Sequence, residues 1–185
     1  MRTLVACPVG RKRDYSLPHW AAATEGYERA VAIDDAKYAD RVEHMGIRVL
    51  RFPTSHPWVP RCFNDAWRTI THHAEEEGFT HILSLESDII APPHILKVME
   101  REYEGGFLCH HYPFRKPRQG MCAEMGCTLA STELWRKALS TCPAGVAVYD
   151  WFRLSGKFEV QRIEVVELLH MEQEPLLGSD PRKQN

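Results

Sequence analysis

Short apolar runs alternate with amphipathic segments along the first half of the chain. The apolar runs are of strand length and predict buried strands over residues 3–7, 30–33, 47–52 and 80–85. Between them, apolar residues recur at the spacing of a helix face and predict helices over 16–23, 36–45 and 61–77. This alternation predicts an α/β fold, in which a mostly parallel, Rossmann-like sheet is covered by helices on both faces.

The second half continues the pattern with shorter elements. A helix is expected from Pro92 or Pro93 to Tyr103, and Ser131 is expected to cap a later helix. Strands are predicted over 107–109, 126–130 and 163–169. We therefore expect one domain over residues 1–174, followed by a polar tail over 175–185.

Two acids follow the apolar run of the stretch Thr80–Pro93, THILSLESDIIAPP. Residues two apart in a strand point to the same face, so Glu86 and Asp88 are expected to aim together beyond the strand end. Two carboxylates beside apolar residues are costly unless a cation meets them. A divalent metal carrying a phosphate would supply that cation, and an acidic surface loop is the alternative.

Composition and charge limit the classes of protein to which this chain can belong. The chain has 185 residues, of which 44% are hydrophobic and 26% charged, which is typical of a globular domain and excludes a disordered chain. A net charge of −2 argues against a protein that binds polyanions over its whole surface. The start lacks the order of a signal peptide, and no stretch approaches the roughly 18 apolar residues of a membrane helix, so we expect a soluble, cytoplasmic protein. The six cysteines are then expected to be reduced thiols.

Four motifs occur along the chain in an order that indicates a family resemblance. Glu86-Ser87-Asp88 comes first, and MGCTLASTELW (Met125–Trp135) leads into a helix. YDWFRLSGKFEV then supplies Asp150, and LLHM supplies His170. In this combination the chain resembles a compact, family-two-like GT-A glycosyltransferase, in which an Asp-x-Asp motif follows the central strand. Glu86 departs from that motif at its first acid.

The resemblance implies a metal-dependent, inverting sugar transfer from a nucleoside-diphosphate sugar, with UDP as the expected nucleotide. Asp88 and His170 would hold Mn²⁺ or Mg²⁺, which neutralises the diphosphate leaving group. Glu86 would act on the ribose or on a metal-bound water, and Asp150 would be the base that takes the acceptor proton. The implied donor-binding residues are Pro8, Arg11, Asp34 or Asp35, Arg61 and Asn64.

Structural roles are the alternatives for these residues. Asp150 suits a helix cap, His170 a core histidine, and Arg61 and Asn64 the start of a helix. A nucleotidyltransferase of related fold is the alternative enzyme, and PVGRKR after the first strand weakly resembles its basic, glycine-rich loop. A binding module without catalysis is a third class, and intact Asp88, Asp150 and His170 argue against it.

The acceptor side is expected in a basic and aromatic loop. His110 and His111 begin it, and Arg115 and Arg118 lie within it. That mixture suits a polyanion with bases that stack, so a hydroxymethylated base in DNA is one predicted acceptor. A polysaccharide or protein acceptor is the alternative. A zinc site in the same Cys/His-rich stretch is disfavoured, because Cys122 and Cys127 are spaced too widely.

Overall fold

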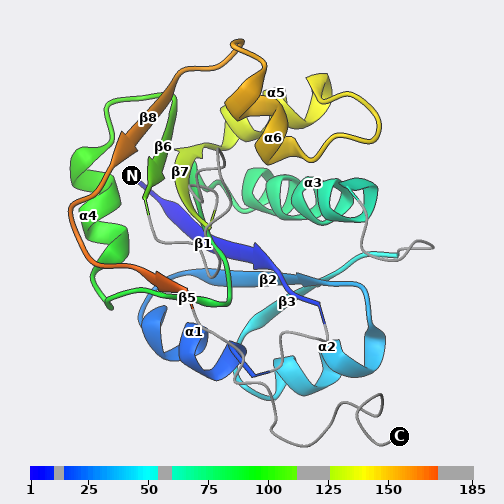
Figure 1. The fold of residues 1–185 in the computed structure, drawn as a ribbon. Coiled ribbons are helices and arrows are strands. Elements are labelled where there is room, and N and C mark those ends of the chain that lie inside the picture. The colour runs from blue at the N-terminus through cyan, green and yellow to red at the C-terminus, as the bar shows by residue number, and fades with distance from the viewer. Residues whose placement is uncertain (11–14, 54–59, 112–125, 171–185) are drawn as a thin grey trace, which may run out of the picture.

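A seven-stranded sheet forms the centre of the molecule (Figure 1). The computed structural model describes residues 1–10, 15–53, 60–111 and 126–170. The strand order is β3-β2-β1-β4-β7-β6-β8, and each strand except β7 runs in the same direction. The strands are β1 (Thr3–Pro8), β2 (Arg29–Ile33), β3 (Arg48–Arg51), β4 (His81–Leu85), β6 (Phe107–His110), β7 (Cys127–Ser131) and β8 (Val160–Ile163).

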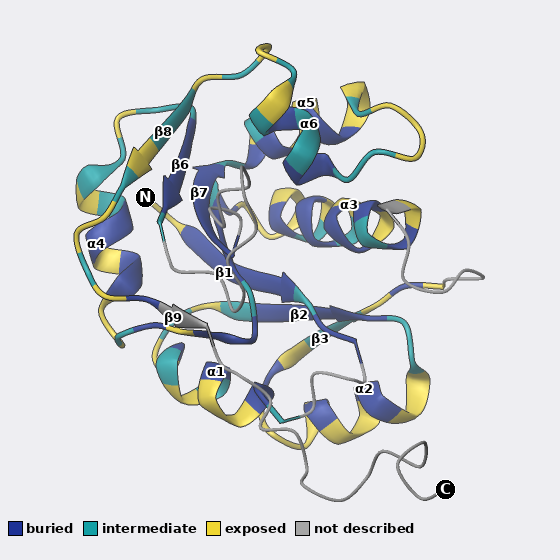
Figure 2. Ribbon diagram, in the orientation of Figure 1, coloured by how far each residue is buried: buried dark blue, intermediate teal, exposed yellow. Residues whose placement is uncertain are grey.

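Helices cover both faces of this sheet. One face carries α1 (Leu17–Ala23), α2 (Ala36–Glu43) and α4 (Ile95–Glu102), and the other carries α3 (Pro60–Glu76), α5 (Thr132–Thr141) and α6 (Val148–Leu154). Figure 2 shows the buried residues gathered along the strands and on the inward sides of these helices. The predicted α/β fold with a mostly parallel sheet in a single domain is therefore confirmed.

Alternation of side chains divides the central strands between two cores. Successive residues of a strand point to opposite faces, so Val5 and Leu83 enter one core while Leu4 and Ile82 enter the other. The second core is aromatic. The rings of Trp67 on α3 and Trp135 on α5 stack with centroids 4.6 Å apart. Phe107 of β6 stacks on Phe152 of α6 at 3.9 Å.

The prediction for the last strand was wrong. Instead of one strand over 163–169, the chain forms β8 and, six residues later, the short strand β9 (Leu169–His170). β9 leaves the main sheet and pairs antiparallel with β5 (Ile89–Ile90), so that His170 lies opposite Ile89. The exposed residues 164, 165 and 167 explain why a continuous buried strand does not form there.

Removing one buried ring tests how much the aromatic core contributes to the stability of the fold. Trp135→Ala is expected to lower the free energy of unfolding by about 3–5 kcal/mol, because a fully buried indole leaves a cavity. Urea denaturation followed by circular dichroism measures this. Trp151→Ala, which removes a partly exposed indole on α6, should cost clearly less, and equal losses in the two variants would contradict the assignment of the core.

Candidate active site

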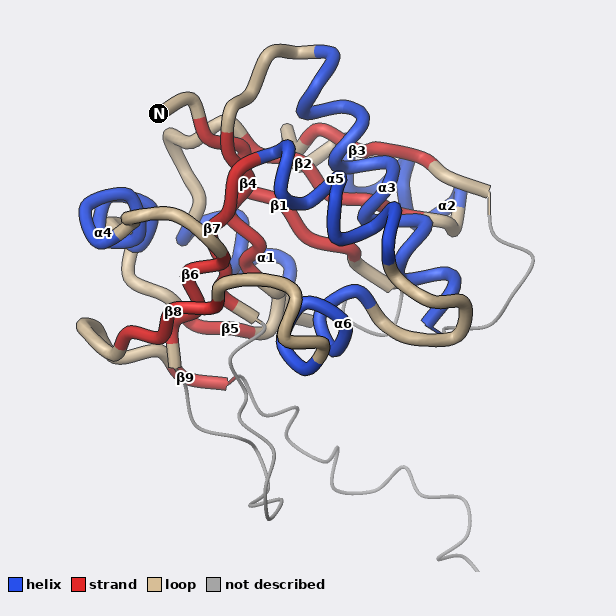
Figure 3. The backbone as a smooth tube through the Cα atoms, turned by 90° about the horizontal axis from the view of Figure 1, so that it is seen from above, coloured by secondary structure: helices blue, strands red, loops and turns tan. Residues whose placement is uncertain are grey.

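The carboxyl ends of the parallel strands meet at one edge of the sheet, which we call the carboxyl edge. Pro8 ends β1, Asp34 and Asp35 follow β2, Glu86 follows β4 and His111 follows β6. In open α/β sheets, ligands bind at this edge. Figure 3 shows α6 and the β5–β9 pair on the side of the molecule opposite the N-terminus.

The two acids after β4 lie in a turn and not on a strand face. The chain turns at Ser87 and Asp88, and the amide of Ile89 donates to the carbonyl of Glu86 at 3.0 Å. The prediction that both carboxylates continue one strand face was therefore wrong. Asp88 is 1% exposed, whereas Glu86 is partly exposed. The turn thus gives the two acids different environments, and Asp88 is the buried one.

Hydrogen bonds hold the end of β4 from both faces of the sheet. On one face, the indole Nε1–H of Trp20 donates to the carbonyl of Leu85 at 2.8 Å. On the same face, the Ser16 hydroxyl donates to the Ser87 hydroxyl at 3.1 Å. On the other face, the hydroxyls of Ser84 and Tyr149 lie 2.6 Å apart in the buried core. These contacts fix the backbone that carries Glu86 and Asp88.

Ser16 is the N-cap residue of α1. Its hydroxyl makes no cap hydrogen bond and instead binds Ser87. The short polar side chain therefore joins the start of α1 to the acidic turn. The basic residues Arg11, Lys12 and Arg13 precede Ser16 in the sequence and lie outside the described residues.

The buried carboxylate of Asp88 is the candidate metal ligand at this turn. The pairing of β5 with β9 places the backbone of His170 opposite Ile89, the residue after Asp88. Among the described residues, no group of three or more His, Cys, Asp and Glu side chains gathers as a metal site. Mg²⁺ is usually bound by one or two carboxylates while substrate phosphates and waters complete its shell. A buried carboxylate at a ligand-binding edge fits that type of site better than it fits a closed protein cage.

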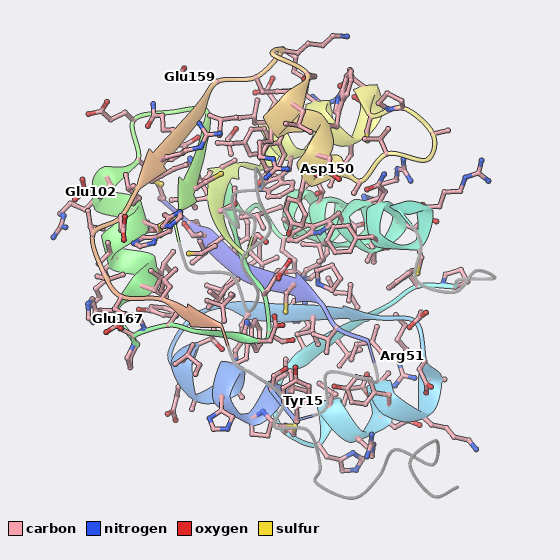
Figure 4. All side chains as sticks on the ribbon, in the orientation of Figure 1. Tyr15, Arg51, Glu102, Asp150, Glu159 and Glu167 are labelled. Carbon is pink, nitrogen blue, oxygen red and sulfur yellow. The ribbon has the colours of Figure 1, made fainter. Side chains whose placement is uncertain are left out.

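Asp150 occupies the first turn of α6. Its carboxylate accepts a hydrogen bond from the guanidinium of Arg153 at 3.2 Å. The Asp150 side chain is 43% exposed and that of Arg153 is 8% exposed. The aromatic residues beside it in the sequence, Tyr149 and Trp151, therefore do not exclude water from it. In Figure 4 Asp150 lies above the sheet on α6, while Tyr15 lies below it.

The residues expected to bind the donor differ in their exposure and in their hydrogen-bond partners. Asp34 is partly buried, and its Oδ2 lies 3.9 Å from the sulfur of Cys62. Asp35 is the N-cap of α2 and accepts the amide of Tyr38 at 2.9 Å, so Asp34 is the acid better placed for a ligand. Arg61 is exposed at the start of α3. Arg11 lies outside the described residues.

Asn64 has a role that the sequence did not predict. It is 4% exposed, its amide nitrogen donates to the carbonyl of Val146 at 2.7 Å, and its amide oxygen accepts from the Val148 amide at 2.8 Å. Both ends of the side chain are therefore engaged with the segment that opens α6. These bonds disfavour Asn64 as a diphosphate ligand.

His110 is also engaged within the fold. Its Nδ1 lies 2.7 Å from the carbonyl of His111, and its Nε2 accepts the amides of Val165 and Val166 at 3.2 and 3.3 Å. An Nε2 that accepts two amides carries no proton, so Nδ1 donates and the ring is neutral. His110 therefore anchors the loop after β8 and does not face an acceptor. His111 is partly exposed, and Arg115 and Arg118 lie outside the described residues.

An open apolar pocket adjoins the acidic turn. It has a volume of about 430 Å³ and is lined by Ile90, Ala91, Pro92, His94, Val166 and Glu167. Figure 4 shows Glu167 near the end of α4 that faces this region. Ile90, two residues after Asp88, lines this pocket, whereas Asp88 itself does not.

Sequence reasoning missed the residues that hold the site together. Asn64, Ser84 and Tyr149 act through contacts across 65 or more residues, which no local pattern reveals. Two signals were available. Ser84 is a polar residue among the apolar residues Ile82, Leu83 and Leu85, and Ala147 precedes α6 where a capping side chain is usual.

Comparison with solved structures shows which fold this is. The chain is similar to CMP:2-keto-3-deoxy-manno-octonic acid synthetase complexed with CTP, with a TM-score of 0.57 at 13% identity over 88% of each chain. It is similar to the inositol-1-phosphate CTP transferase from T. maritima, with a TM-score of 0.60 at 11% identity, covering 94% of this chain and 90% of that one. HddC from Yersinia pseudotuberculosis, complexed with GMP-PN, gives 0.53 at 10% identity, covering 89% and 91%.

These likenesses show the fold, a Rossmann-like α/β domain with a mostly parallel sheet. No protein-family model matches the sequence, and no curated protein sequence matches it. Within the described part of the chain, no helix combines the length and the apolar character needed to cross a membrane.

Acidification is expected to weaken the protein through His110. Burial lowers the pKa of His110 below its ordinary value, against the opposing effects of the His111 carbonyl and Glu164. The unfolded chain therefore binds the proton first, from about pH 6.5 downward, and stability falls as the pH drops through the folded pKa. His73 and His81, whose pKa values burial also lowers, act in the same direction.

The matched variant is His110→Gln, whose amide oxygen can accept the same backbone amides without titrating. Urea unfolding between pH 7.5 and 5 should show a smaller loss of stability in this variant than in the wild type. Identical pH profiles for the two proteins would contradict the role given to His110.

Proposed function

We propose that this protein is a nucleotide-dependent transferase that acts on a sugar or a sugar phosphate at the carboxyl edge. The observation that carries the proposal is the acidic turn at the end of β4, where the buried Asp88 lies one residue from the partner of His170. We assign Asp88 and His170 as protein ligands of Mg²⁺ or Mn²⁺, which would neutralise the phosphates of the nucleotide when bound. Asp34, Arg61, Pro8 and Arg11 remain our candidates for nucleotide contacts.

The comparisons favour nucleotidyl transfer as the reaction. Two of the similar proteins are a CMP:2-keto-3-deoxy-manno-octonic acid synthetase, which was solved with CTP, and an inositol-1-phosphate CTP transferase. The third, HddC, was solved with GMP-PN. In that reaction a phosphate oxygen of the sugar phosphate attacks the α-phosphorus of the nucleoside triphosphate, and pyrophosphate leaves. Arg11, Lys12 and Arg13 after β1 supply cations that suit a triphosphate.

Glycosyl transfer is the second candidate, and a different observation favours it. Asp150 lies in the first turn of a helix that is bonded to β4 and to α3. A partly exposed carboxylate there suits a base that takes the proton of an acceptor hydroxyl. The hydroxyl oxygen would attack the anomeric carbon of a nucleoside-diphosphate sugar, and the nucleoside diphosphate would leave. We propose no DNA acceptor, since no described residue supports one.

Products distinguish the two reactions. The protein is incubated with Mg²⁺ or Mn²⁺ and either a nucleoside triphosphate with a sugar 1-phosphate, or a nucleoside-diphosphate sugar with simple glycoside acceptors. We expect pyrophosphate release with the first set. If nucleoside diphosphate is released, and only with the second set, the reaction is glycosyl transfer and not nucleotidyl transfer. If neither set gives a product, the proposed function is contradicted.

Metal-dependent nucleotide binding is expected to require Asp88. Asp88→Asn keeps the size of the side chain but removes the charge, so nucleotide affinity in the presence of Mn²⁺ should fall by about tenfold or more, the scale expected for a lost charge-assisted contact. Isothermal titration with and without EDTA measures this. Asp65→Asn, which removes an exposed carboxylate on α3, should bind as the wild type does. Unchanged affinity in Asp88→Asn would contradict the metal assignment.

A further inference from the structure

The N-terminus of α6 has no cap from its own segment. Its N-cap residue is Ala147, whose side chain makes no cap hydrogen bond. The first amides of a helix need acceptors, and an adjacent Ser, Thr, Asp or Asn usually provides one. Here Asn64, 84 residues earlier in the chain, accepts the amide of Val148 at 2.8 Å. Asn64 therefore caps α6 from another helix.

The same side chain also holds the residue before the cap. The amide nitrogen of Asn64 donates to the carbonyl of Val146 at 2.7 Å. Since one planar amide bonds both sides of Ala147, it fixes the position and the direction of the entry into α6. Asn64 is 4% exposed, so water does not compete readily for either bond.

A second contact fixes the first turn of α6 from the sheet. Tyr149 is fully buried, and its hydroxyl lies 2.6 Å from that of Ser84 on β4. Ser84 is two residues before Glu86. The residue after Tyr149 is Asp150, so the carboxylate of Asp150 is placed by one bond to α3 and one to the strand that carries the acidic turn.

We infer that Asn64 is a positioning residue that sets the place of Asp150 relative to the acidic turn. This inference is based on the second candidate for the proposed function, glycosyl transfer, in which Asp150 takes the proton of the acceptor hydroxyl. It gives Asn64 a role different from a nucleotide ligand. The nucleotide side is formed by the strand ends and the acidic turn, so loss of the Asn64 bonds shifts Asp150 and leaves nucleotide binding intact.

The test compares Asn64→Leu, Asn64→Asp and Ser131→Ala. Leucine removes both bonds at similar size, whereas aspartate keeps an acceptor for the Val148 amide. Ser131→Ala is the matched control, because Ser131 caps α5 by accepting the Leu134 amide at 3.2 Å and lies at the end of β7 directed away from the carboxyl edge.

We expect Asn64→Leu to lower kcat by about tenfold to a hundredfold, the scale of a small misplacement of a reacting group, with little change in nucleotide affinity. Asn64→Asp should recover part of kcat, and Ser131→Ala should retain it. A weaker nucleotide affinity with unchanged kcat in Asn64→Leu would make Asn64 a ligand residue and overturn the inference.

Hydrogen exchange separates failure of this inference from failure of the proposed function. The amides of Val148 and Tyr149 should exchange faster in Asn64→Leu than in the wild type and in Ser131→Ala. An inactive wild type that shows this difference would overturn the proposed function and leave the cap from α3 in place. Equal exchange in all three folded proteins would overturn the inference even if the wild type is an active transferase.

Discussion

Polar groups at the end of β4 must find partners inside the molecule, and the helices on both faces are arranged to provide them. Ser84 and the Leu85 carbonyl lie in the middle of the sheet, where an unpaired polar group costs about 1–3 kcal/mol. The hydroxyl of Tyr149 on α6 bonds that of Ser84, and the indole of Trp20 on α1 donates to the Leu85 carbonyl. One central strand thereby determines where two helices lie.

The same contacts hold the candidate site on the sheet. The acidic turn begins one residue beyond Leu85, and Ser87 within it is bonded to Ser16. Asp88 is buried at this turn, and β9 returns to pair beside it after some eighty residues of chain. Side chains on such a supported edge keep their geometry better than side chains on free loops.

The sequence predicted the fold well because its strongest signals are periodic. The apolar runs of β1, β2 and β4 and the apolar face of α3 give unambiguous elements, and their alternation gives the parallel sheet. The end of β4 was harder to predict, because Glu-Ser-Asp is compatible with both a strand and a turn. In the structure, a backbone hydrogen bond between Ile89 and Glu86 closes a turn there. The region after Ile163 was also misjudged, because three exposed residues interrupt what looked like one strand.

The sequence alone points to the acids of the candidate site but not to the residues that support them. Asp88 and Asp150 stand out by type and position, whereas Asn64 and His110 look like ligands until their partners are seen. Both are polar residues at element ends, which is where binding residues and structural caps equally occur. Their bonds to 146–148 and to 165–166 are long-range contacts, and only the folded structure shows them.

We propose that a divalent metal and a nucleotide meet at the acidic turn. Paramagnetic Mn²⁺, added with a nucleotide to the isotope-labelled protein, broadens the amide signals of nearby residues. Selective broadening is expected at residues 86–90 and 169–170, and it should be lost when Mg²⁺ replaces Mn²⁺. Broadening confined to other parts of the molecule, or none at these residues with the nucleotide bound, would contradict it.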